Sequence, residues 1–138
     1  MTTQTRFRVR YAETDQMGIV HHSNYYVWME MGRSDYCRAT GVRYSDMEQG
    51  DGVYLAVAKS ECRYVFPAHY DEELIVETEI SKAHTRLVEF TYRILRVEDG
   101  RLLAEGHTTH VFCDREMQRR KLPEKYWALF GIESAPVR

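Results

Sequence analysis

The sequence predicts an α+β fold, in which one long central helix packs on a five-stranded, largely antiparallel sheet with short accessory helices. Two observations carry this prediction. Apolar residues recur at helical spacing from Tyr25 until Gly41, and the segment 54–113 holds four stretches with the two-residue period of strands. Consecutive strands joined by short turns are antiparallel, and one helix covers only one face of their sheet. The 138 residues are about the length of one domain, so we expect a single domain spanning 1–138.

The first expected element is a short strand near the N-terminus. One face carries Phe7, Val9 and Tyr11, and the other carries Arg6, Arg8 and Arg10. This alternation is typical of a strand with one buried face.

The long helix is expected to begin at Ser23 or Asn24, both of which are favourable N-cap residues, and to end at Gly41, which can adopt a left-handed conformation. Gly32 on its apolar side would let the helix axis approach the sheet. The predicted apolar stripe consists of Tyr25, Trp28, Met29, Gly32, Tyr36 and Ala39.

Four further strands are expected at 54–66, 73–83, 87–97 and 102–113. In the first, Ala56 and Ala58 would lie on the inner face and make room for Gly32. In the last, the small or apolar inner residues would be Leu102, Ala104, Gly106 and Thr108.

The connections between these strands carry their own signals. Ser45 or Asp46 would cap a short helical turn, and Asp99-Gly100 is a strong signal for a hairpin turn. A second short helix is expected from Pro123 to Gly131.

Composition narrows the functional classes. The chain has a net charge of −2, so it lacks the basic excess that is typical of general nucleic-acid binders. Three cysteines without metal-site spacing favour reduced thiols, and no apolar run approaches the ~20 residues of a membrane helix. We therefore expect a soluble, cytoplasmic protein that neither binds nucleic acid nor inserts into a membrane.

The segment 11–25, YAETDQMGIVHHSNY, carries the strongest functional signal. It is similar to the motif of hotdog-fold acyl-CoA thioesterases of the 4-hydroxybenzoyl-CoA thioesterase and YbgC-like group: an acid, two residues, a glycine, two apolar residues, and an aromatic or His pair before a helix. The resemblance covers nearly the whole chain, including Leu122-Pro123 near its end. It implies a helix wrapped by the sheet and protomers that pair edge to edge, as a homodimer or homotetramer.

The resemblance places Asp15 at the catalytic position. Thioester hydrolysis needs a nucleophile or base near the carbonyl carbon and donors for the oxyanion. The ionised Asp15 carboxylate could attack directly or activate a water, and the residues do not separate these routes. The alternative is that Asp15 only forms an Asx turn, as most loop aspartates do.

The start of the long helix is the expected source of oxyanion donors, from a peptide N–H near His22 or Ser23. By resemblance His22 would also orient the acyl group, whereas His21 would shape the loop. The alternative is that both histidines only pack against the helix start. Gly18 is expected to permit the turn after Asp15.

A basic cluster follows the last strand. Arg119, Arg120 and Lys121 could bind the phosphates of coenzyme A, or could simply be solvated surface charges. No metal is expected, because His107 and His110 would point to opposite faces of a strand.

These residues predict an acyl-CoA thioesterase that uses no cofactor, with coenzyme A entering only as part of the substrate. Two other functions stay open: a non-catalytic acyl-CoA or acyl-carrier binding protein, and a hydratase on the same fold.

Overall fold

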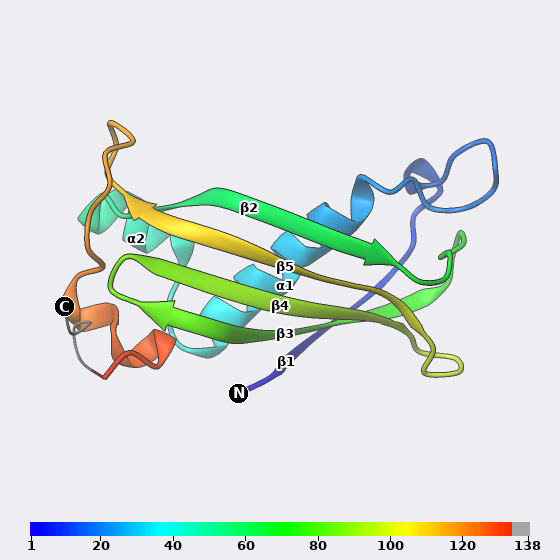
Figure 1. Ribbon diagram of the computed structural model, residues 1–138. Helices are drawn as coiled ribbons and strands as arrows, with labels where there is room; N and C mark the ends of the chain where they lie inside the picture. Colours follow the sequence, from blue (N-terminus) through cyan, green and yellow to red (C-terminus); the bar gives the residue numbers. More distant parts are fainter. Residues whose placement is uncertain (134–138) are drawn as a thin grey trace.

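A computed structural model describes residues 1–133 (Figure 1). The elements in chain order are β1 (Thr3–Arg8), η1 (Tyr11–Glu13), α1 (Asn24–Ala39), α2 (Tyr44–Asp51), β2 (Tyr54–Tyr64), β3 (Glu73–His84), β4 (Leu87–Arg96), β5 (Leu102–Cys113), η2 (Glu124–Tyr126) and η3 (Ala128–Phe130). The predicted fold class is confirmed, because one long helix packs on an antiparallel sheet of five strands. No helix within residues 1–133 is both long and apolar enough to cross a membrane.

The strand order is β1-β3-β4-β5-β2, so β1 and β2 form the two edges of the sheet. In Figure 1 the sheet curves in front of α1, which lies along its concave face. The loop between β1 and α1 projects at one end of the sheet, and α2 and the C-terminal segment lie at the other.

The core forms between α1 and the inner faces of β3 and β4, as the alternation predicts. The buried inner residues of these two strands are Leu74, Val76, Thr78, Val88, Phe90, Tyr92 and Ile94. On α1, Trp28 packs against Phe7 of β1 with 4.9 Å between ring centroids. Cys37 is buried in place of the expected Ala39, which is exposed.

The prediction that Gly32 packs against Ala56 and Ala58 is wrong. A Cβ placed on Gly32 would collide with Thr78 and come within 3.0 Å of Val76 Cγ1, so at Gly32 the helix lies against β3. The face of β2 was also misassigned at its start. A β-bulge between Val57 and Lys59 shifts the register against β5 by one residue. One extra residue moves side chains to the opposite face. The inner face therefore carries Leu55 and Val57 before the bulge and Ser60, Cys62 and Tyr64 after it.

Smaller corrections concern the ends of elements. Tyr11 lies in η1 and is 76% exposed, so it does not belong to the first strand. A register irregularity in the β4–β5 pairing buries Leu103 in place of Leu102. α2 begins after Arg43, before the expected Ser45 or Asp46. The expected C-terminal helix consists of the two 3₁₀ turns η2 and η3, and Gly131 closes the second with a φ of 75°.

Candidate active site

Asp15 lies at the base of a narrow turn between β1 and α1. Its N–H donates to the Ile19 carbonyl at 2.9 Å, and the Gly18 N–H donates to the Asp15 carbonyl at 3.0 Å. Thr14 and Val20 form an isolated bridge that closes the turn. Gly18 has a φ of 79°, which side-chain-bearing residues rarely adopt.

The Asp15 carboxylate takes part in this turn with only one of its oxygens. Oδ1 accepts the Met17 N–H at 2.8 Å, which is an Asx turn. Among residues 1–133 no donor reaches the other oxygen, and the side chain is partly buried. The turn and a chemical role are therefore compatible in the same side chain.

The start of α1 follows Ser23, which is the N-cap residue but does not cap the helix with its side chain. Its hydroxyl instead contacts His21 Nδ1 at 2.8 Å, and the Ser23 N–H makes a long contact of 3.3 Å with the same nitrogen. The Asn24 N–H donates to the His21 carbonyl. Within residues 1–133 the His22 N–H has no hydrogen-bond acceptor. An unpaired N–H at a helix start can donate a hydrogen bond to a ligand oxygen and stabilise the negative charge that develops on it.

Glu13 organises the connection between this loop and α1, and the sequence interpretation missed it. Its carboxylate is 3% exposed and accepts the Arg10 N–H at 2.7 Å and Trp28 Nε1–H at 2.8 Å. Its carbonyl accepts the His21 N–H and the Asn24 side chain. Burial opposes ionisation, but the hydrogen bonds from Arg10 and Trp28 outweigh it and lower the pKa of Glu13. The spacing of Arg10 and Glu13, which resembles a capping box, was the available signal.

Tyr64 is a second residue that the sequence interpretation missed. Its hydroxyl donates to the His22 carbonyl at 3.3 Å, and its ring meets Tyr25 edge-on with centroids 5.1 Å apart. The His21 and His22 rings lie 4.2 Å apart beside it. The last residue of β2 therefore contacts the start of α1, although the two are far apart in sequence.

The structure does not bring the basic cluster together with Asp15 in one chain. Tyr64 pairs with Ala104 near the start of α1, whereas Tyr54 pairs with Cys113 at the opposite end of β5. Cys113 is nine positions beyond Ala104 in the strand, which corresponds to about 30 Å. The predicted phosphate-binding residues Arg119, Arg120 and Lys121 follow Cys113, at the end of the molecule where Figure 1 shows α2.

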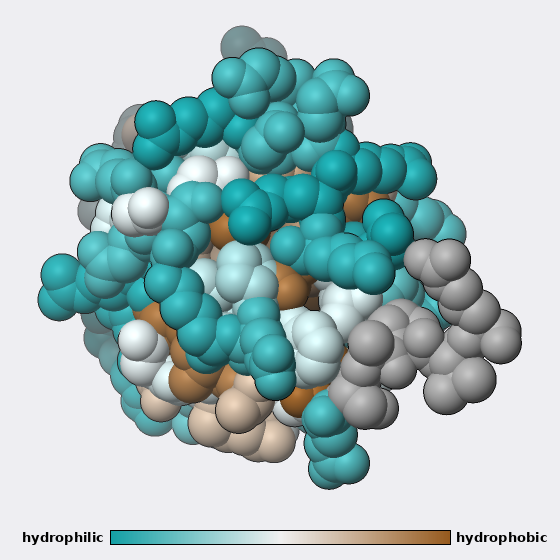
Figure 2. All heavy atoms as spheres, turned by 90° about the vertical axis from the view of Figure 1, so that its left-hand side faces the viewer, coloured by the Kyte–Doolittle hydropathy of each residue, from teal (hydrophilic) through white to brown (hydrophobic). Residues whose placement is uncertain are grey.

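Arg120 of this cluster and the nearby Arg115 stabilise α2. Arg120 Nη1 donates to the Asp51 carbonyl at 3.0 Å, and Arg115 Nη2 donates to the Gln49 carbonyl at 3.1 Å. Both bonds satisfy carbonyls at the C-terminal end of a helix, where positive charge is favourable. Arg119 and Lys121 are exposed. Figure 2 shows that this end of the molecule is largely hydrophilic.

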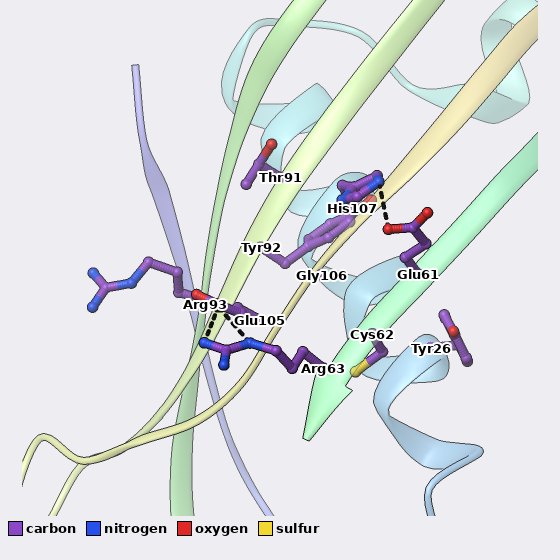
Figure 3. Close-up of a pocket in the computed structure, with 10 residues that line it drawn as sticks. All are labelled: Tyr26, Glu61, Cys62, Arg63, Thr91, Tyr92, Arg93, Glu105, Gly106 and His107. Atoms are coloured by element: carbon purple, nitrogen blue, oxygen red, sulfur yellow. Dashed lines mark hydrogen bonds and ion pairs between the residues drawn. The ribbon is translucent and has the colours of Figure 1, made fainter. Parts of the chain in front are cut away.

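A hollow of about 650 Å³ lies elsewhere, mainly on the outer face of the sheet (Figure 3). Each of its charged side chains is paired, and the partner of Arg93 is Glu77, outside the hollow. Glu61 contacts His107 at 3.2 Å, and Arg63 Nε donates to Glu105 at 2.9 Å. Asp15 does not line it. Among residues 1–133 no charged side chain that lines the hollow is left unpaired, so it is a weaker candidate site than the loop before α1.

The two strand histidines lie on opposite faces of β5. His107 is on the outer face, and His110 is buried on the inner face. Residues 1–133 contain no group of three or more His, Cys, Asp or Glu side chains positioned to hold a metal.

Comparisons with known proteins agree on one family. The sequence profile of the thioesterase-like superfamily matches residues 9–129. The putative acyl-CoA thioesterase YneP of Bacillus subtilis is 40% identical over 114 residues, which are 83% of this chain and 81% of YneP. The acyl-CoA thioester hydrolase YbgC of Escherichia coli O157:H7 is 32% identical over 124 residues, 89% of this chain and 91% of YbgC. A crystal structure of DHNA-CoA thioesterase from Staphylococcus aureus superposes with a TM-score of 0.85 and 30% identity, covering 92% of this chain and 84% of that one.

Proposed function

The chain belongs to the thioesterase-like superfamily, and from this premise we propose that it hydrolyses acyl-CoA thioesters to a free acid and coenzyme A, with Asp15 as the reacting carboxylate. The enzyme class rests on relatives named acyl-CoA thioesterases that align with most of the chain. The observation that supports Asp15 is its unoccupied carboxylate oxygen in the loop that leads to the open His22 N–H.

The chemistry needs only these groups and water. In one route the Asp15 carboxylate attacks the thioester carbon, the thiolate of coenzyme A leaves, and water hydrolyses the resulting anhydride. In the other, Asp15 takes a proton from water as the water attacks the same carbon. In both routes negative charge develops on the carbonyl oxygen, and in this proposal the His22 N–H donates a hydrogen bond to that oxygen. Ser23 and His21 hold each other and keep this peptide in place.

The acting form in this proposal is a homodimer that pairs through β2. This edge strand has 11 residues, and on its inner face Val57 is 58% exposed and Tyr64 is 45% exposed. The other edge, β1, has only 6 residues, and α1 covers its inner face through Phe7 and Trp28. A long, uncovered, partly apolar edge strand requires a partner to avoid aggregation.

The basic cluster can bind the phosphates of coenzyme A only in such a dimer. Since Arg119 and Lys121 lie about 30 Å from the Asp15 end of their own sheet, they can serve a substrate only in another subunit's site. Replacing both by Ala is then expected to weaken coenzyme A binding mainly at low ionic strength. Unchanged affinity at low salt would remove them from the site.

The experiment that tests the proposed function is hydrolysis of a panel of acyl-CoA and acyl-carrier-protein thioesters by the purified protein, followed by release of free thiol. Turnover of an acyl-CoA is expected. Binding without release of thiol would favour the acyl-CoA or acyl-carrier binding protein. Consumption of an enoyl thioester without thiol release would favour the hydratase.

A further inference from the structure

Arg33 is a partly buried arginine without an acid partner. It lies on α1 beside the sheet, and Nη1 donates to the Tyr92 hydroxyl at 3.2 Å. Within residues 1–133 no carboxylate forms an ion pair with it, although Glu30 lies one turn earlier on the same helix. By contrast, Arg38 at the end of α1 pairs with Asp35 at 2.7 Å. A cation removed from water without a counter-charge is unfavourable unless something else supplies one.

The groups behind Arg33 form a chain of hydrogen bonds that ends in a surplus donor. The Tyr92 hydroxyl lies 2.6 Å from Thr108 Oγ1, which in turn lies 2.8 Å from His110 Nε2. Arginine can only donate, so Tyr92 accepts from it and donates to Thr108, and Thr108 donates to His110 Nε2. The proton of the neutral imidazole is then on Nδ1. That nitrogen belongs to a side chain only 1% exposed, and it has no partner within residues 1–133.

Both ends of this chain of hydrogen bonds therefore offer unused N–H donors. Arg33 uses one of its five N–H groups in a hydrogen bond, and His110 Nδ1–H is unused. Burial of unsatisfied donors is unfavourable, so such a cluster is typical of a place that binds an oxygen-rich anion.

The cluster lies at one end of a strip of the inner sheet face that starts at the candidate active site, and the β2 side of this strip is exposed at Val57 and Ser60. Along the inner face of β5 and β2, Ala104 pairs with Tyr64 near His22, Gly106 pairs with Cys62, and Thr108 pairs with Ser60. The side chains of Gly106, Cys62 and Ser60 are small, and Ser60 is exposed. In Figure 3 α1 passes behind these strands.

The helix runs beside this strip in the same order. Tyr25 contacts Tyr64 at its start. Further along, Met29 meets Gly106 so closely that a Cβ on that glycine would lie 2.6 Å from Met29 Cε. Arg33 then reaches Tyr92 and, through it, Thr108. At 1.5 Å per residue, Arg33 is about 13 Å along the helix from Asn24.

We infer that Arg33, backed by Tyr92, Thr108 and His110, is a receptor for a carboxylate at the far end of the acyl group, so that the preferred substrates are acyl-CoA thioesters with a second, distal carboxylate. This inference rests on the proposed function for the position of the thioester. A carboxylate of a second copy of the chain has the same chemistry and is the other source that the experiment must separate.

The test compares two acyl-CoA thioesters of equal length, about ten carbons to match the ~13 Å span, one ending in a methyl group and one in a carboxylate. Wild-type protein is expected to favour the carboxylate-ended substrate at least tenfold in kcat/KM. Arg33→Gln should reduce that ratio at least tenfold, and Arg33→Lys, which keeps the charge, should retain part of it. Arg38→Gln, on the same helix but already paired with Asp35, is the matched control and should keep the wild-type ratio.

If wild-type kcat/KM is about equal for the carboxylate-ended and the methyl-ended substrate, the inference is overturned. If sedimentation also shows that Arg33→Gln dissociates the dimer, the carboxylate belongs to the second copy. A ratio that survives in Arg33→Gln overturns it as well. If Arg33→Gln does not fold, Tyr92→Phe removes the hydroxyl that orients Arg33 and should lower the ratio severalfold.

Thermal stabilisation by free dicarboxylic and monocarboxylic acids gives a readout independent of hydrolysis. The dicarboxylic acid should stabilise the wild type more than the monocarboxylic acid does, and Arg33→Gln should lose this difference. Equal stabilisation by both acids contradicts the receptor, whereas absent thioester turnover contradicts the proposed function alone.

Discussion

The buried Glu13 carboxylate accepts a hydrogen bond from Trp28 Nε1 at 2.8 Å, and this bond joins the loop that carries Asp15 to the second turn of α1. Arg10 donates its N–H to the other oxygen of the same carboxylate. Two buried donors on two different oxygens require a group with two acceptors, which among side chains means a carboxylate.

Glu13→Gln is therefore expected to destabilise the protein although it preserves size and shape. The amide has one oxygen, so either Trp28 or Arg10 would face an NH₂ group. The free energy of unfolding should fall by about 1–3 kcal/mol, with a loss of turnover as the loop shifts. Denaturant unfolding measures the change, and Glu98→Gln at an exposed position is the control. Unfolding curves that coincide with the wild type would refute this account of Glu13.

Asp15→Asn should abolish catalysis without unfolding the protein. Asparagine keeps the oxygen that accepts the Met17 N–H, so the turn survives, but the anion is lost. Turnover of the best thioester should fall a hundredfold or more, on the order of 3 kcal/mol of barrier.

Asp114→Asn is the matched control for this change. Asp114 also accepts backbone N–H groups in a turn, from Glu116 and Gln118, but at the opposite end of the sheet. Its replacement should leave turnover intact. An Asp15→Asn protein that folds normally and keeps more than a tenth of wild-type turnover would eliminate the proposed role of Asp15.

Gly32→Ala should destabilise the protein, although alanine is the better helix former by about 1 kcal/mol. The new methyl group would collide with Thr78 and press on Val76 at 3.0 Å, and overpacking costs about 1–3 kcal/mol. Gly50→Ala in α2 is the control, because nothing lies within 4 Å of its added Cβ, and it should be neutral or stabilising. Equal stability of the two variants in urea would show that α1 can move away from β3.

Ser60→Lys should dissociate the proposed dimer while leaving the protomer folded. Ser60 is exposed near the middle of β2, so its replacement costs little within one chain, whereas a charge there opposes edge-to-edge pairing. Sedimentation at micromolar concentration should shift toward monomer. Gln4→Lys on β1 places the same charge on the other edge of the sheet and should leave the protein sedimenting as a dimer. A shift caused by Gln4→Lys alone would move the interface to β1.

The stability of the protein should fall on acidification because of His110. Burial, and then the charge of Arg33, lower the pKa of His110 from 6.5 to about 4. The unfolded state therefore binds more protons than the folded state between these values, so the free energy of unfolding decreases as the pH drops from about 6.5 to 4.

The contribution of His110 is on the order of 3 kcal/mol across that interval. His110→Gln cannot titrate and keeps an acceptor for Thr108, so its unfolding free energy should depend less steeply on pH. Chemical denaturation at a series of pH values measures both slopes. Parallel curves for the two proteins would exclude His110 as the titrating group.

Local patterns by themselves determined several features of this protein. The alternation in β3 and β4 identified their buried faces, and helical spacing together with Gly41 identified α1 and its end. The motif around Asp15 and Gly18 identified the family. Each of these signals depends on residues within a few positions of one another, where backbone geometry couples sequence directly to conformation.

Features that depend on contacts between distant segments are visible only in the folded protein. The bulge after Val57 depends on how β2 pairs with β5, and it reversed the expected face of Ala56. Glu13 is buried because Trp28 closes over it, and Arg33 of α1 meets Tyr92 of β4 only because the helix packs on the sheet. Arg119 is far from Asp15 because β5 separates them, and each residue of a strand adds about 3.3 Å to its length.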